Sequence, residues 1–426
     1  MDISLNYGKA QLAVALPDGL DVTIIRRPAM PLLGDPVAAL EAAFAKPDGG
    51  APLARLAGAA TTACILICDI TRPVPNGVIL PPLLRAMLAA GMDAANISLL
   101  VATGLHRPNE GAELAELVGD RWVMDTFPVE NHFARDDAAH VALGRTRSGT
   151  VVKLDKRFVK ADLRIATGLV EPHFMAGWSG GRKVIAPGVA HAETITTLHS
   201  ARFMERPECA NCFLDGNPLH EEILEIITMI GGAHAVNVVI DEERRISLAN
   251  FGEVVASHLK AVDHARAYAE VAVAERFPTV VTSAAGYPLD KTYYQTVKGM
   301  IGPLDILAPG GTLVIASACS EGMGSPDYVA AQRRLIERGP EQFLRDIESK
   351  SHAAIDEWQT EMLLKPLRVG RVGLYTDGLS AEEHALTGVD AIDSVAEAVA
   401  DAVAVAGDRR VAVIPEGPYV VPRYRP

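Results

Sequence analysis

Short apolar runs alternate with amphipathic segments along most of the chain. Uninterrupted apolar runs at 63–68, 97–102 and 163–170 are typical of strands that are buried on both faces of a sheet. Between and after them, 80–90 and 219–230 have the spacing of helices, and the second of these begins after an Asn-Pro pair. This alternation predicts a largely parallel sheet with helices on both of its faces.

The same pattern repeats after a change in composition near residue 270. A long alanine-rich helix is expected at 253–276 as a connector, so we divide the chain into an N-terminal domain, 1–270, and a C-terminal domain, 271–426. The fold class expected is therefore α/β, with two α/β domains and mostly parallel sheets. We also expect the last residues to fold back onto the first domain. The other elements predicted are a hairpin at 3–15, strands at 236–240, 279–284, 312–318, 372–376 and 411–414, and a helix at 292–306.

Composition narrows the class of protein. The chain has 426 residues, of which 49% are hydrophobic and 22% charged, as in ordinary soluble globular proteins. A net charge of −13 disfavours nucleic acid as a partner, since nucleic-acid-binding proteins present basic faces. Five cysteines, an odd number, argue against a disulfide framework. With no signal peptide and no membrane-spanning run in the sequence, we expect a cytoplasmic protein.

Polar residues follow three of the predicted strands. Arg72 lies in Asp-Ile-Thr-Arg-Pro after the first apolar run, His106 in Thr-Gly-Leu-His-Arg-Pro after the second, and His173 in Glu-Pro-His-Phe after the third. Ligands of open α/β sheets bind at the carboxyl ends of strands. Two histidines beside a substrate can act as acid and base. An ordinary polar loop at a strand end is the favoured interpretation of each segment when it is taken alone.

The segment after the third strand is rich in glycine and in cations. Ser179 and the backbone N–H groups of Gly180 and Gly181 can bind a phosphate, and Arg182 and Lys183 add positive charge. The alternative is a plain glycine turn between a strand and a helix. Neither the Walker spacing nor G-x-G-x-x-G is present here.

Three further features leave alternatives open. His199, on a predicted helix, is either a ligand for a borderline metal or an ordinary histidine. Cys209 and Cys212 form a C-x-x-C pair, but no second pair follows at zinc-site spacing, which favours an incidental pair. Trp358 lies on a predicted helix and is either a core residue or part of a pocket wall.

Taken together and in order, these segments resemble the nickel-dependent lactate racemase family. The resemblance runs from about residue 60 to about residue 360. The matching segments are Asp69–Pro73, Thr103–Pro108, Glu171–Lys183, His199, Asp215–Pro218, Gly286–Asp290, Gln295–Gly299 and Trp358-Gln359.

The resemblance implies a cofactor-binding N-terminal domain, a C-terminal domain that contributes substrate-binding residues, and an active site in the cleft between them. It also implies a nickel-pincer nucleotide, pyridinium-3-thioamide-5-thiocarboxylic acid mononucleotide, joined covalently to Lys183. His199 would be the protein ligand to Ni(II), and His106 and His173 the acid/base pair. The remaining implied residues are Arg72, Gln295, Lys298 and Trp358 for substrate, and Asp69, Ser179, Gly180, Gly181 and Arg182 for the cofactor.

The implied activity is racemisation or epimerisation of a lactate-like 2-hydroxy acid by hydride transfer to and from the cofactor. Its partners would be that small substrate and the enzymes that synthesise the cofactor, with no nucleic acid and no membrane. Tyr293, Tyr294 and Trp358 are candidates for the pocket wall, with core packing an equal alternative for each. Two other functions remain open: a nickel-nucleotide binding or maturation protein without turnover, and a nicotinamide dehydrogenase, against which the missing G-x-G-x-x-G argues.

Overall fold

The structure is a computed structural model that describes residues 1–426, and it contains two compact α/β units. The N-terminal unit consists of Ala29–Leu198 and Phe213–Ala267. The C-terminal unit consists of Met1–Pro28, His199–Cys212 and Tyr268–Pro426. Two segments before the predicted boundary at 270 thus belong to the C-terminal unit, because their contacts lie within its sheet and helices.

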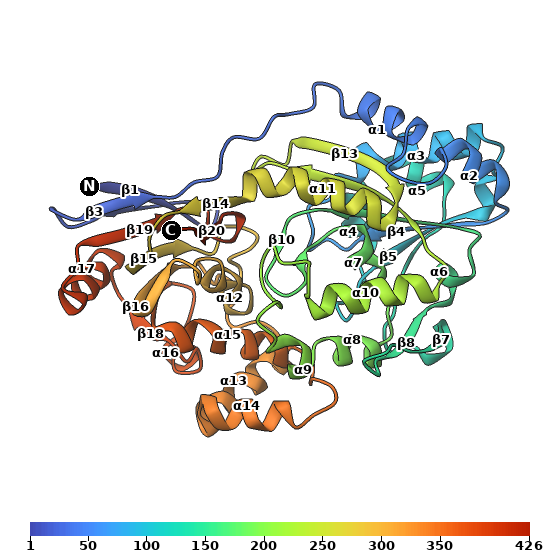
Figure 1. The fold of residues 1–426 in the computed structure, drawn as a ribbon. Coiled ribbons are helices and arrows are strands. Elements are labelled where there is room, and N and C mark those ends of the chain that lie inside the picture. The colour runs from blue at the N-terminus through green and yellow to red at the C-terminus, as the bar shows by residue number, and fades with distance from the viewer. The chain divides into compact units, whose positions relative to one another are not determined.

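The N-terminal unit contains a six-stranded sheet (Figure 1). Its strands are β4 (Ala63–Cys68), β5 (Ile97–Ala102), β6 (Val129–Asn131), β9 (Leu163–Leu169), β12 (His234–Ile240) and β13 (Ile246–Glu253). The order is β13-β12-β9-β4-β5-β6, and every pair is parallel except β12 with β13. All six residues of β4 are buried, as an apolar run in the middle of a parallel sheet requires. The predicted strands at 63–68, 97–102 and 163–170 are confirmed.

Helices and short hairpins complete this unit. The helices are α1 (Pro36–Ala45), α2 (Leu53–Ala59), α3 (Asn76–Ala89), α4 (Gly111–Val118), α5 (Arg121–Thr126), α6 (Lys156–Lys160), α7 (Gly181–Ile185), α8 (Ala192–Leu198) and α10 (Pro218–Met229). The hairpins pair β7 (His140–Arg145) with β8 (Val151–Asp155), and β10 (Pro172–His173) with β11 (Gly177–Trp178). The side chain of Asn217 accepts hydrogen bonds from the first turn of α10, which confirms the helix start predicted from Asn-Pro.

The C-terminal unit contains a second six-stranded sheet, which is parallel throughout. Its strands are β3 (Asp21–Ile24), β15 (Phe277–Ser283), β16 (Leu307–Ala316), β17 (Arg371–Tyr375), β18 (Asp390–Ile392) and β19 (Arg410–Ile414), in the order β18-β17-β16-β15-β19-β3. The predicted hairpin at 3–15 is confirmed as β1 (Asp2–Tyr7) and β2 (Ala10–Ala15). The helices are α9 (Ala201–Met204), α12 (Tyr293–Ile301), α13 (Pro326–Arg338), α14 (Pro340–Glu348), α15 (Glu357–Val369), α16 (Ala381–His384) and α17 (Val395–Ala406).

One face of this sheet is covered by the hairpin and by α17 (Figure 1). Val281 and Val314 of the central strands pack in one core with Val395 and Val399 of α17. Ile315 points the other way, because successive strand residues alternate faces, and it lies against α12. Helices therefore cover both faces, as expected.

Two expectations about the second half of the chain are wrong. The helix predicted at 253–276 is α11 (Val254–Ala269), and the chain continues as a short strand, β14 (Glu270–Val273). β14 pairs with the last strand, β20 (Val421–Tyr424), so the chain end closes on the C-terminal unit instead of the first domain. Residues 270–273 form a strand because they pair with β20, although the composition of the longer segment favours a helix.

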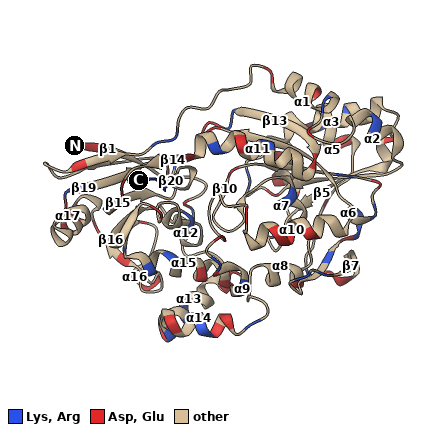
Figure 2. Ribbon diagram, viewed as in Figure 1, with Lys and Arg blue, Asp and Glu red and all other residues tan.

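None of the helices combines the length and the apolar character that crossing a bilayer requires. Figure 2 shows acidic and basic residues interspersed on α14, whereas the charged residues of α10 are all acidic.

Candidate functional site

Three neighbouring strands of the N-terminal sheet end in candidate residues. Asp69 follows β4 directly, His106 follows β5, and His173 follows β9. Because β9, β4 and β5 are adjacent and parallel, their carboxyl ends meet at one edge of the sheet.

Asp69 and His106 form a hydrogen-bonded pair. His106 Nδ1 lies 2.6 Å from Asp69 Oδ2, and the hydroxyl of Thr71 donates to Asp69 Oδ1 at 2.6 Å. Burial raises the pKa of Asp69, but these hydrogen bonds and the charge of His106 outweigh it and hold the pKa below its ordinary value. The His106 side chain is 60% exposed while the Asp69 side chain is 7% exposed. A buried carboxylate thus orients an accessible imidazole.

Arg72 forms an ion pair with Glu171, and this pair joins the ends of β4 and β9. Arg72 Nη1 lies 2.6 Å from Glu171 Oε1, and both side chains are partly exposed. Burial opposes the charge of Arg72, but Glu171 outweighs it and raises the pKa of the guanidinium. Glu171 has no functional role in the sequence prediction, which mentions it only as part of the motif around His173.

His173 is buried in the short hairpin β10–β11, with its ring stacked on Phe174 at 5.2 Å between centroids. Its Nδ1 accepts hydrogen bonds from the backbone N–H groups of Met175 and Ala176, both at 3.2 Å. The imidazole therefore caps the turn that follows it in the chain.

The glycine-rich turn is held by the protein itself. The Ser179 hydroxyl donates to Leu169 O at 2.6 Å and accepts from the N–H of Glu171 at 3.0 Å. The N–H of Gly181 donates to Asn237 Oδ1 at 2.9 Å. The Ser179 hydroxyl and the Gly181 N–H, two of the groups in which the sequence suggested a phosphate site, thus fasten the start of α7 to β9 and β12.

Close packing explains the glycines of this turn. Gly180 has φ of 121°, and a Cβ atom there would lie 2.7 Å from His258 Cδ2 and 2.8 Å from a Val170 methyl group. A Cβ atom on Gly168 of β9 would overlap the backbone of Gly181. Helix α7 therefore lies directly against the sheet.

Arg182 is fully buried beneath the turn, with no carboxylate bonded to it. Its Nη2 donates to Ala176 O at 3.2 Å and to Trp178 O at 3.0 Å, while Nε and Nη1 have no hydrogen-bond partner. Burial lowers the pKa of this guanidinium to about 9. Arg182 supports the turn from below.

Lys183, on the first turn of α7, is partly exposed. Its charge acts on Cys68, the last residue of β4, which places Lys183 near the carboxyl end of that strand. It is the residue of the glycine-rich segment that best suits contact with a ligand.

The candidates of the C-terminal unit gather around Trp358. The rings of His199 and Trp358 lie 4.6 Å apart, and Trp358 Nε1 donates to the Tyr294 hydroxyl at 3.2 Å. Gln295 and Lys298 lie on the same helix as Tyr294, α12, and Gln295 Oε1 is buried without a hydrogen-bond partner. These contacts bring the metal-ligand candidate and the pocket-wall candidates together.

The two adjacent tyrosines, candidates for either the core or a pocket wall, have different surroundings. Tyr293 is fully buried and its hydroxyl donates to Thr387 O at 2.6 Å, which makes it a core residue. Tyr294 also accepts at its carbonyl oxygen from Gln359 Nε2, at 2.6 Å. Tyr294 thus fixes the start of α15.

The C-x-x-C pair is not part of a metal cluster. Cys209 and Cys212 are both buried, and burial raises the pKa of Cys209 to about 12. The structure contains no group of three or more His, Cys, Asp or Glu side chains that could hold a metal ion.

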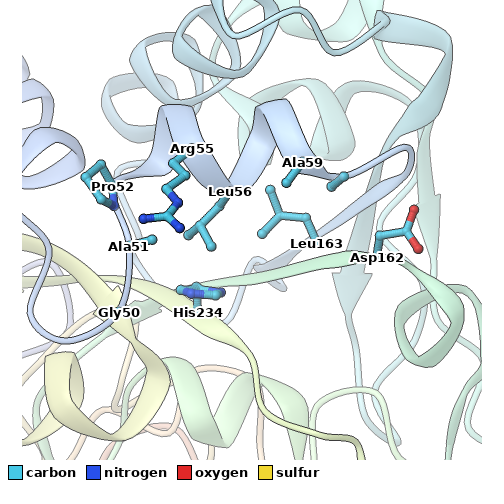
Figure 3. Close-up of a pocket in the computed structure, with 10 residues that line it drawn as sticks. Gly50, Ala51, Pro52, Arg55, Leu56, Ala59, Asp162, Leu163 and His234 are labelled. Carbon is cyan, nitrogen blue, oxygen red and sulfur yellow. The ribbon is translucent and has the colours of Figure 1, made fainter.

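A cavity of about 610 Å³ lies at the opposite edge of the N-terminal sheet (Figure 3). It is lined by the first residues of β9 and β12, Leu163 and His234, and by Arg55 and Leu56 of α2. Because it lies at the amino ends of the strands, it is separate from the candidate residues at their carboxyl ends.

Comparisons with known proteins cover almost the entire chain. A family model described as "Lactate racemase N-terminal domain" matches residues 7–211, and one described as "Lactate racemase C-terminal domain" matches residues 273–421. A lactate racemase of Thermoanaerobacterium thermosaccharolyticum is 31% identical over 99% of both chains, and one of Lactiplantibacillus plantarum is 33% identical over 68% of both. The solved structure of the T. thermosaccharolyticum lactate racemase apoprotein superposes with a TM-score of 0.91 at 30% identity, covering 99% of this chain and 100% of that one.

Proposed function

The chain belongs to the lactate racemase family, and from this premise we propose that it racemises a small 2-hydroxy acid with lactate as the first candidate substrate. The observation that carries the proposal is the Asp69–His106 pair beside Arg72 at one edge of the N-terminal sheet. An oriented imidazole can take the hydroxyl proton of a 2-hydroxy acid, and a guanidinium can bind its carboxylate.

We propose a nickel-pincer nucleotide as the cofactor, attached to Lys183, with His199 as the protein ligand to Ni(II). The donor chemistry fits such a group, because a pincer brings its own donors and the chain places one imidazole, that of His199, against Trp358. When bound, the cofactor would accept and return the hydride that leaves the α-carbon. The packing of His199 against Trp358 would fix the orientation of its ring.

The chain's own residues would handle the proton and the carboxylate. His106 and His173 are the acid/base candidates for the substrate hydroxyl. Arg72 and Lys298 are the candidates for its carboxylate, and the unpartnered oxygen of Gln295 suits a hydroxyl donor. Asp69 would serve the reaction by orienting His106 in addition to any role in holding the cofactor.

Helix α7 would present Lys183 for attachment while the rest of the turn stays fixed. The contacts of Ser179, Gly181 and Arg182 support this division, since the Ser179 hydroxyl, the Gly181 N–H and Arg182 Nη2 all bond to the protein. The five cysteines are buried thiols, which supports the cytoplasm as the proposed compartment. The enzymes that synthesise the cofactor are the proposed maturation partners.

The first test separates attachment from turnover. The chain is produced together with cofactor-synthesis enzymes, and intact mass is compared for the wild type, Lys183→Ala and the charge-preserving control Lys183→Arg. We expect an added mass in the wild type alone, since neither variant has an ε-amino group to form the link. An adduct of unchanged mass in either variant would show that Lys183 is not the attachment site.

The second test measures the reaction. The loaded protein is incubated with single enantiomers of 2-hydroxy acids that differ in side chain, beginning with lactate, and both enantiomers are quantified by chiral chromatography. We expect racemisation of at least one acid with a small side chain. A fully loaded protein that racemises none of them would instead be a nickel-nucleotide binding or maturation protein.

A further inference from the structure

The two candidate acid/base histidines are held by opposite kinds of hydrogen bond. His106 Nδ1 faces a carboxylate oxygen of Asp69 at 2.6 Å. His173 Nδ1 faces two backbone N–H groups, those of Met175 and Ala176, at 3.2 Å each. One Nδ1 therefore meets an acceptor, and the other meets donors.

These partners determine where each neutral imidazole carries its proton. A neutral ring has one N–H group and one bare nitrogen. An ionised carboxylate only accepts, so Nδ1 of His106 carries the proton and Nε2 is bare. Backbone N–H groups only donate, so Nδ1 of His173 is bare and Nε2 carries the proton.

The same contacts resist the charged form of His173. An imidazolium would place an N–H group of its own against the N–H groups of Met175 and Ala176, and two hydrogen bonds would be lost. His173 is also only 7% exposed, so a charge on it would be poorly solvated. His106 meets neither obstacle, because its side chain is 60% exposed and its Nδ1 faces a carboxylate oxygen of Asp69 instead of N–H groups.

We infer, on the premise of the proposed racemase function, that His106 alone carries the substrate hydroxyl proton in both directions, while His173 stays neutral and donates a hydrogen bond from Nε2 to a substrate oxygen. In the oxidation half, the O–H bond breaks and its proton moves to Nε2 of His106. The C–H bond breaks with its electron pair leaving as hydride, and the C=O bond forms. In the return half, hydride is added to carbon and the proton on His106 goes back to oxygen, so protons and electrons balance.

This division of roles has a consequence for the substrate. If one histidine serves both enantiomers, both place the hydroxyl group at the same position and present the α-hydrogen in the same direction. They then differ by an exchange of the carboxylate and the side chain. A cation is needed for each position of the carboxylate, and the side chain has to be small enough to take the place of a carboxylate.

The first experiment reads the tautomers without any need for turnover. The full-length chain is labelled with ¹⁵N-histidine, and long-range ¹H–¹⁵N correlations are recorded near pH 8. His106→Gln and His173→Gln identify the signals of each ring among the 12 histidines. We expect a protonated Nδ1 in His106 and a protonated Nε2 in His173. A protonated Nδ1 in His173, or a protonated Nε2 in neutral His106, would overturn the inference.

The second experiment uses the same two variants in the loaded enzyme. A glutamine amide retains a hydrogen-bond donor near the position of Nε2 but cannot hold an extra proton. We therefore expect His106→Gln to lose about 10²- to 10⁴-fold in kcat, the usual contribution of a positioned base. We expect His173→Gln to lose no more than about tenfold, and equally from both enantiomers.

A third variant, His173→Asn, separates the loss of the hydrogen-bond donor at Nε2 from the loss of the cap on the turn. Its oxygen lies near the position of Nδ1 and can still cap the turn, but it places no donor at Nε2. We expect it to fold and to lose more activity than His173→Gln. A loss in His173→Gln as large as that in His106→Gln would refute the unequal roles, and if His173→Gln does not fold, the tautomers of the wild type still decide. A loaded wild type that racemises nothing would refute the proposed function while leaving the tautomer result intact.

Discussion

Replacing Asp69 by asparagine should reverse the tautomer of His106. Asp69 uses its two oxygens for different partners, since Oδ1 accepts from the Thr71 hydroxyl and Oδ2 accepts from His106 Nδ1. In Asp69→Asn, the hydroxyl of Thr71 favours keeping the amide oxygen at the first position. The amide nitrogen is then placed at the second position, where it donates to Nδ1 of His106 and moves the ring proton to Nε2.

The expected loss follows from what Nε2 does in the proposed reaction. A protonated Nε2 cannot accept the hydroxyl proton, so the contribution of the base, about 10²- to 10⁴-fold, should disappear. A thousandfold loss in kcat corresponds to about 4 kcal/mol in the activation free energy. The fold should survive, because the amide preserves the number of hydrogen bonds at this buried position, and we expect a fall of about 1–2 kcal/mol in the free energy of unfolding.

The assay has to separate turnover from cofactor loading. Racemisation rates are divided by the loaded fraction, which intact mass gives for each preparation, and the histidine tautomers are recorded as for the wild type. Asp162→Asn is the matched control, because Asp162 accepts hydrogen bonds from Thr61 and Thr62 just before β4, at the amino edge of the same sheet. It should keep the wild-type rate. If Asp69→Asn turns over as fast as the wild type, or if its loss is only a loss of loading, the orienting role of Asp69 is wrong.

Two further predictions concern stability. Burial, reinforced by the neighbouring Glu205, raises the pKa of Glu361 well above its ordinary value. The contribution of Glu361 to stability is therefore complete below the unfolded-state pKa of 4.5 and is lost as the pH rises through the folded-state pKa. The free energy of unfolding of the wild type, measured with urea, should fall relative to that of Glu361→Gln as the pH is raised, and parallel curves would contradict this. Gly177→Ala should cost at least about 2 kcal/mol in the free energy of unfolding, because φ is 74° and a Cβ atom would overlap Phe213 O. Gly231→Ala, with φ of 75° and no atom nearer than 3.9 Å, should lose less in the same urea titration, and equal losses would rule out the overlap as the cause.

The buried strands could be predicted from sequence because their signal is local. The apolar run at 63–68 is β4 without a shift of either end, and Asn217 marks the start of α10 by a contact within one helical turn. β3 lacked such a signal, because Asp21–Ile24 becomes a strand through its pairing with β19, almost 400 residues later. The division of the chain into units depends on that pairing.

The contacts within the candidate site could not be predicted from local sequence either. Arg72, His106 and His173 were found because each follows an apolar run, yet their partners depend on the order of the strands. The Asp69–His106 pair spans 37 residues and the Arg72–Glu171 pair spans 99. Only the adjacency of β9, β4 and β5 brings these groups together, and apolar runs do not encode which strands are neighbours.

The turn that caps His173 explains why the guanidinium of Arg182 is buried. The backbone of Ala176 is held at both ends, since its N–H donates to His173 Nδ1 and its carbonyl oxygen accepts from Arg182 Nη2. Burial lowers the pKa of Arg182 only to about 9, so the side chain still carries its charge at neutral pH and donates strongly to that carbonyl. This hydrogen bond helps to fix the turn in which the N–H groups of Met175 and Ala176 face His173. Arg182 thus helps to keep the proton of His173 on Nε2 without touching the ring.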